Sequence, residues 1–112
     1  MSVAIVPTSA NNKLVINCHV LASTNGGTEP TVALFKAGFP NALAVVNTYA
    51  AANEPKSFAL NASTMALTTS SLTISARGGC QAGNAFYFNG YIAARKFGGV
   101  AGSSIIVTEI FA

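Results

Sequence analysis

The sequence contains no aspartate, and its 112 residues include only three acidic side chains and one histidine. Because a Ser-His-Asp triad needs an aspartate, that triad is excluded. The only histidine, His19, has no catalytic partner nearby in the sequence. The only acids are Glu29, Glu54 and Glu109, which lie near turns or the C-terminus, so a pair of catalytic carboxylates would require distant parts of the chain to meet. We therefore expect a protein that is not an enzyme and has no catalytic residues.

Charge of either sign is scarce. Charged residues make up 8% of the chain, against a usual share of about 25%. Hydrophobic residues make up 51%, and the mean hydropathy is +0.48. Few charged side chains therefore remain on the surface to repel neighbouring protein molecules.

Long apolar runs are also missing. A membrane-spanning helix needs about 18 consecutive apolar residues, and the longest runs here, such as Ala42–Val46 and Ile105–Val107, have the length of a strand. We expect no membrane span. The first seven residues lack the basic start and apolar stretch of a secretory signal, so either the chain is made in the cytoplasm and stays there, or a signal has been removed.

The basic residues are scattered along the chain. The six basic residues outnumber the three acidic ones, which gives a formal net charge of +3, but they extend from Lys13 to Lys96, and only Arg95 and Lys96 are adjacent. A nucleic-acid-binding face would require a basic patch or stripe. We expect no specific nucleic-acid partner.

Cysteines and glycines give no sign of a metal or cofactor site. Cys18 and Cys80 do not form a CxxC pair for zinc, and no calcium-loop spacing is present. Cys18 lies in a strand pattern and is expected to be buried, whereas Cys80 follows glycines and is expected to be more exposed; a bridge between them remains open. The Gly78-Gly79 and Gly98-Gly99 pairs lack the phosphate-loop pattern and are interpreted as turns. No cofactor is expected.

Period-two alternation of apolar and polar residues dominates the chain and predicts half-buried strands. Ala50–Ala52 could begin a helix, but Pro55 limits it to a turn. The pattern predicts a single all-β domain over residues 1–112, an antiparallel β-sandwich or jelly-roll-like fold of about eight strands. The expected strands are Leu14–Val20, Thr31–Lys36, Leu43–Tyr49, Ser57–Leu60, Thr64–Leu67, Ser71–Arg77, Ala85–Phe97 and Ser104–Phe111.

The predicted strand Ala85–Phe97 contains Asn89-Gly90, which is also a strong hairpin signal. We favour one long strand, because the alternation continues in phase through Gly90. One face then carries aromatic, amide and guanidinium groups that can stack and form hydrogen bonds, namely Tyr87, Asn89, Tyr91 and Arg95. Such a face suits a subunit contact, an ordinary surface, or a ligand or glycan site.

The last predicted strand is apolar on both faces. Ile105, Val107 and Phe111 share one face, and Ile106 and Ile110 share the other. We expect this strand to be buried on both sides, either at the centre of its sheet or under another subunit.

These features together predict a subunit of an assembly, because uncharged polar and aliphatic side chains can be buried at contacts with little desolvation cost. The charge-poor composition and the ending Gly98–Glu109 resemble small bacteriophage virion proteins of the tail-fibre and capsid-decoration type. The resemblance implies a capsid, decoration or tail component located in the virion. Its partners would be copies of itself and other virion proteins. The alternative is a receptor- or carbohydrate-binding module that uses the aromatic strand face on a host-surface glycan.

Overall fold

The computed structural model describes residues 1–90 and 99–112. Within these residues the chain forms eight strands and no α-helix. The strands are β1 (Ser2–Ile5), β2 (Lys13–Thr24), β3 (Thr31–Lys36), β4 (Ala44–Asn47), β5 (Lys56–Met65), β6 (Leu72–Gly79), β7 (Phe86–Phe88) and β8 (Ser104–Ile110). The predicted all-β class is confirmed.

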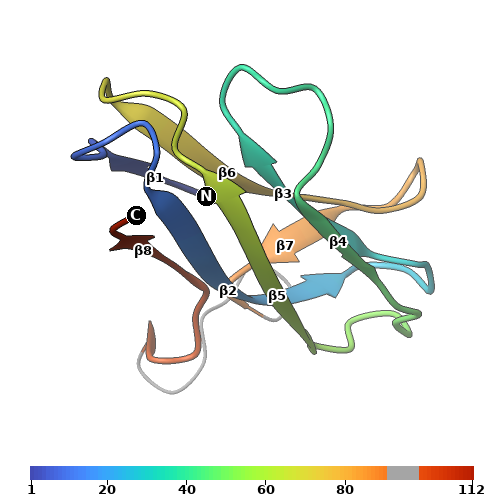
Figure 1. The fold of residues 1–112 in the computed structure, drawn as a ribbon. Helices are drawn as coiled ribbons and strands as arrows, with labels where there is room; N and C mark the ends of the chain where they lie inside the picture. The colour runs from blue at the N-terminus through green and yellow to red at the C-terminus, as the bar shows by residue number, and fades with distance from the viewer. Residues whose placement is uncertain (91–98) are drawn as a thin grey trace.

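The strands form two antiparallel sheets that pack as a sandwich (Figure 1). Sheet A has the order β1-β6-β3-β4. Sheet B is built on the long strand β2, which pairs with β5 along one edge. Along its other edge β2 pairs with β7 near Thr24 and with β8 from Lys13 to His19. The turn at Asn25–Gly27 therefore carries the chain from one sheet to the other.

The core lies between the sheets and follows the predicted alternation. Every second residue of β2 points inward and is buried, and the same holds for the inward residues of β3 and β6. Leu72, Ile74 and Ala76 of β6 are buried as expected. The main cluster contains Ile16, Cys18, Val20, Ala22, Val32, Leu34, Phe58, Leu60, Ile74 and Ala76.

Three strand predictions were wrong in detail. Strand β1 was not foreseen, because four residues before Pro7 carry little pattern and are held by pairing with β6. The two strands predicted on either side of Asn61–Ser63 are one strand, β5, because these residues continue the pairing with β2. Gly78 and Gly79 are the last residues of β6 rather than a turn, and they pair with Val32 and Thr31.

Gly78 allows a close approach of an aromatic ring. A Cβ atom at this position would overlap the Phe86 ring of β7. Phe86 and Phe88 both pack against the core cluster. Their two rings meet edge to face, with ring centroids 5.0 Å apart. The glycine thus makes room in sheet A for an aromatic side chain from sheet B.

Candidate functional site

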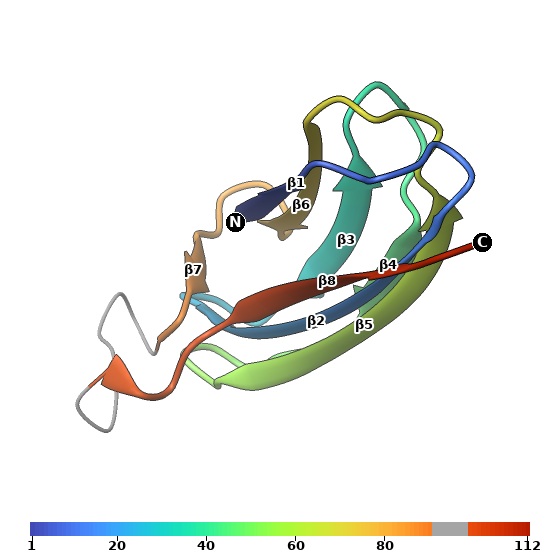
Figure 2. The same cartoon turned by 60° about the vertical axis from the view of Figure 1, so that its left-hand side comes forward.

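Strand β8 forms a free edge of sheet B. It pairs with β2 through the register from Lys13–Ile110 to His19–Ser104. No other described strand pairs with its second edge. Figure 2 shows β8 running along the side of the sandwich, near β1. Ile5 of β1 and Val107 of β8 both pack on the small cluster formed by Leu14, Ala66 and Leu72.

The two faces of β8 differ in burial. Ile105 and Val107 point inward and pack on the core. Ile106 and Ile110 point outward and are 59% and 48% exposed. Phe111 lies beyond the end of the strand and is 73% exposed. The expected central position is therefore wrong, because β8 lies at an edge of sheet B and, among the described residues, its outward face is not covered. Burial of that face under another subunit stays a prediction.

The outer face of sheet B carries few charges. Lys13 of β2 lies between Met65 of β5 and Ile110 of β8 in the register. Asn17 lies between Asn61 and Ile106 in the same way. His19, on the same face, lies between Ala59 and Ser104, neither of which is a titratable partner.

Asn89 is not on a strand face, which corrects the prediction of one long strand. Strand β7 ends at Phe88, and Asn89 adopts a φ of 62° in a turn. Its Oδ1 accepts a hydrogen bond of 2.7 Å from the backbone N–H of Ser103, and its own N–H donates to Leu21 O at 2.8 Å. The side chain therefore ties the segment before β8 to the end of β7.

The other residues of the predicted aromatic face are not brought together by the described structure. Tyr87 is half-buried on β7. Tyr91 and Arg95 lie outside the described residues. Of the two described residues of the predicted face, Tyr87 lies on a strand as expected and Asn89 lies in a turn.

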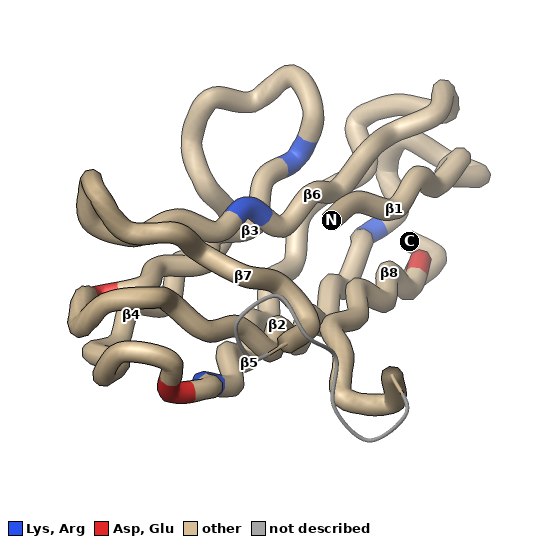
Figure 3. The backbone as a smooth tube through the Cα atoms, turned by 180° about the vertical axis from the view of Figure 1, so that it is seen from behind, with Lys and Arg blue, Asp and Glu red and all other residues tan. Residues whose placement is uncertain are grey.

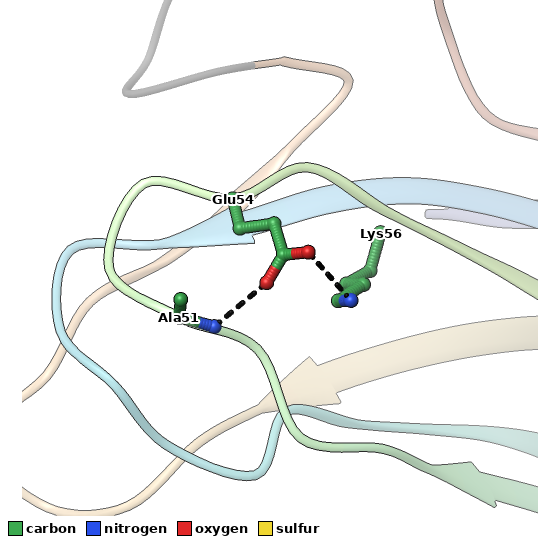
Figure 4. A network of polar contacts seen from close by, with 3 residues as sticks. All are labelled: Ala51, Glu54 and Lys56. Carbon is green, nitrogen blue, oxygen red and sulfur yellow. Dashed lines mark hydrogen bonds and ion pairs between the residues drawn. The ribbon is translucent and has the colours of Figure 1, made fainter.

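The acidic residues lie apart from one another, and charged residues are sparse over the described fold (Figure 3). Glu54 accepts hydrogen bonds from Ala51 N at 2.9 Å and Lys56 Nζ at 2.8 Å (Figure 4). The hydrogen bond from Lys56 and that from Ala51 lower the pKa of Glu54. These contacts join the turn before β5, where Asn53 has a φ of 61°, to the first residue of that strand.

Within the described residues, no three or more His, Cys, Asp or Glu side chains gather as a metal site. Both cysteines are free thiols; Cys18 is buried, which raises its pKa, and Cys80 is partly exposed, as expected. In the described part of the chain, no helix is long and apolar enough to cross a membrane.

Two grooves lie on sheet A. The first, of about 820 Å³, is lined in part by Phe35, Lys36, Phe39 and Arg77, and the Arg77 guanidinium lies 4.6 Å from the centroid of the Phe35 ring. The second, of about 690 Å³, lies at one end of the sheet and is lined by Thr28, Glu29, Thr31, Asn47, Tyr49, Gly79, Cys80 and Gln81.

Sequence reasoning did not single out either groove. The sequence did contain an indication of the second groove, since alternation in the predicted strand Leu43–Tyr49 places Asn47 and Tyr49 on one face. The pattern does not show which residues lie beside Asn47 and Tyr49, because this depends on the pairing of β3 with β4 and with β6.

Comparison of the sequence with protein-family models finds no matching family, and comparison with curated proteins finds no significant similarity.

Proposed function

We propose that the protein is a non-enzymatic structural subunit of a larger assembly, and that copies of the chain associate through the β8 surface. We define this surface as the free edge of β8 with Ile106, Ile110 and Phe111. The observation that carries the proposal is a free edge strand that exposes two large apolar side chains, Ile106 and Ile110, on its outward face, with Phe111 exposed just beyond its end.

The backbone of β8 supports pairing with another chain. An edge strand presents unpaired N–H and C=O groups, and proteins that remain monomeric usually protect such edges with charge, proline or a bulge. The sequence of β8 has no proline and no basic residue. Its one charged residue, Glu109, accepts hydrogen bonds from Thr8 and Asn12. The edge therefore lacks the usual protection.

The side chains of the β8 surface supply the driving force. Fully burying a side chain such as Ile or Phe contributes about 1.5–3 kcal/mol relative to leaving it exposed. Ile106, Ile110 and Phe111 are each about half exposed or more, so their burial together would contribute a few kcal/mol. Pairing along the edge would then add backbone hydrogen bonds in a partly dried contact.

The low charge of the outer face of sheet B also favours a subunit contact at the β8 surface. The described charged side chain next to Ile110 on the outer face is Lys13, whose aliphatic stem can lie along the apolar neighbours while its ammonium stays in water. An interface core is poorer in charge than the rest of a protein surface. The outer face of sheet B fits that composition.

The assembly that we propose is a virion, with the chain as a capsid, decoration or tail component. The resemblance of composition and C-terminal sequence to small phage virion proteins supports this part of the proposal. Antibodies raised against the chain should label particles purified from cells that produce it. Absence of the chain from such particles would contradict a virion location. It would not bear on self-association, which the substitution of Ile106 tests separately.

Substitution of Ile106 tests the proposed surface. Ile106→Lys should shift the native mass toward the monomer mass of 11.4 kDa, because a lysine at the contact would be desolvated. Val45→Lys is the matched control, since Val45 is 57% exposed on a strand of the other sheet. Equal masses for the two variants, measured by sedimentation velocity, would contradict the proposal.

A further inference from the structure

The groove around Asn47 and Tyr49 has a defined place in the fold. Thr31 begins β3, and it lies opposite Asn47 at the end of β4 and Gly79 at the end of β6. Three connections meet here, and Figure 1 draws them on the right, away from the C-terminus. The groove belongs to sheet A, whereas the β8 surface belongs to sheet B.

Asn47 is held in one orientation. Its Nδ2 donates to Thr31 Oγ1 at 2.7 Å and to the backbone oxygen of Glu29 at 3.4 Å. Asn47 Oδ1 has no hydrogen-bond partner among the described residues. It is therefore a free acceptor whose orientation is fixed by the contacts of Nδ2. A polar group that is already oriented costs less conformational entropy when a ligand binds.

The opposite wall is fixed through Thr28. Its backbone pairs with Ala50, at 3.0 and 2.9 Å, and its Oγ1 accepts a hydrogen bond from Gln81 N at 3.3 Å. The side chains of Gln81 and Glu29 have no hydrogen-bond partner in the described part of the chain. They add an exposed amide and a carboxylate to the groove.

Tyr49 supplies an exposed aromatic surface. Its side chain is 63% exposed, and its hydroxyl lies against Gly27, where a Cβ atom would be only 2.9 Å away. The glycine therefore allows the tyrosine hydroxyl to rest on the backbone. The ring is available to a ligand that has both an apolar face and polar edges.

The lining as a whole selects a chemical class. It combines one exposed ring, two amides, two threonine hydroxyls and one carboxylate, and it contains neither lysine nor arginine. The carboxylate disfavours an anionic ligand. The groove at Arg77, with two basic side chains in its lining, has the opposite preference.

We infer that the groove around Tyr49 binds a neutral saccharide, with a sugar ring stacked on Tyr49 and its hydroxyls bonded to Asn47, Gln81 and Glu29. This site is distinct from the predicted face of Tyr87 and Asn89. It goes beyond the proposed assembly role, because the site lies within one chain on the other sheet.

Saturation-transfer NMR on the protein in its native assembly state tests the inference. The probes are lactose, maltotriose and triacetylchitotriose at millimolar concentration, with N-acetylneuraminic acid as the anionic comparison. We expect ring-proton signals from at least one neutral probe and weaker signals from the acid. Loss of the stacking partner in Tyr49→Ala should weaken binding about tenfold.

Two variants keep the result interpretable. Gln81→Ala removes an exposed side chain that the fold does not use, and it should also weaken binding. Phe39→Ala removes an exposed ring from the other groove and should leave binding unchanged. No signal from any neutral probe, or signals that survive both Tyr49→Ala and Gln81→Ala, would overturn the inference. The native mass of each variant, measured in parallel, separates this outcome from a failure of assembly.

Discussion

Asn12 donates a hydrogen bond of 2.8 Å from Nδ2 to Oε1 of Glu109, and this contact joins residues 97 positions apart. The same carboxylate oxygen accepts from Thr8 N at 2.7 Å. Asn12 Oδ1 in turn accepts from Ala112 N at 3.0 Å, so one buried amide holds both β8 and the C-terminus. The position of the β8 surface thus depends on Asn12.

Glu109→Gln should lower stability at neutral pH. The hydrogen bond from Asn12 is the largest cause of a lowered pKa of Glu109, and Thr8 adds to it. A carboxyl whose pKa is lower in the folded state contributes stability above its unfolded pKa, and that stability is lost as the pH falls through the folded pKa. The difference between wild type and variant in urea unfolding should therefore be present at about pH 7 and shrink toward about pH 3.

Glu29→Gln is the control for this experiment, because it removes the same charge from a side chain with no hydrogen-bond partner among the described residues. A pH dependence that is the same for both variants would contradict the role of Glu109.

Gly78→Ala should destabilise the fold by about 1–3 kcal/mol, because the added methyl group overlaps the Phe86 ring. The neighbouring Gly79→Ala is the matched control, since nothing lies within 4 Å of a Cβ atom there. Urea unfolding measures both. Equal stabilities of the two variants would show that Phe86 does not rest on Gly78.

Lys36→Met should change how stability depends on alkaline pH. Lys36 is 3% exposed, and its Nζ donates to Met65 O at 2.6 Å and lies 4.6 Å from the centroid of the Phe39 ring. Burial lowers the pKa of Lys36 from its ordinary 10.5. Between the folded pKa and 10.5 the unfolded chain binds more protons, so stability rises with pH in that window.

The wild type should therefore gain stability relative to Lys36→Met as the pH is raised from about 7 to about 10. Chemical unfolding of both proteins at each pH measures the difference. A constant difference would argue that the folded and unfolded chains protonate Lys36 alike.

The sequence was informative where a strand has one wet face and one buried face. The inward residues of β2 and β6 were predicted because their alternation follows directly from burial between two sheets. Strand β5 was divided wrongly, because Asn61 and Ser63 favour turns locally but pair with β2 in the fold. Asn89 was misplaced for the opposite reason, since an unbroken alternation concealed a turn.

The candidate sites were harder to foresee. The apolar character of β8 was evident, but whether both faces are covered depends on neighbouring strands that alternation does not specify. The groove at Tyr49 joins residues from three connections, so its composition emerges only once β3, β4 and β6 are placed side by side.

The native mass of the purified chain across a range of concentrations, measured by light scattering, tests the central claim most directly. Association through the β8 surface predicts a species that is a multiple of 11.4 kDa and that grows with concentration or persists on dilution. A single species of 11.4 kDa at every concentration would contradict self-assembly as the role of the exposed β8 residues.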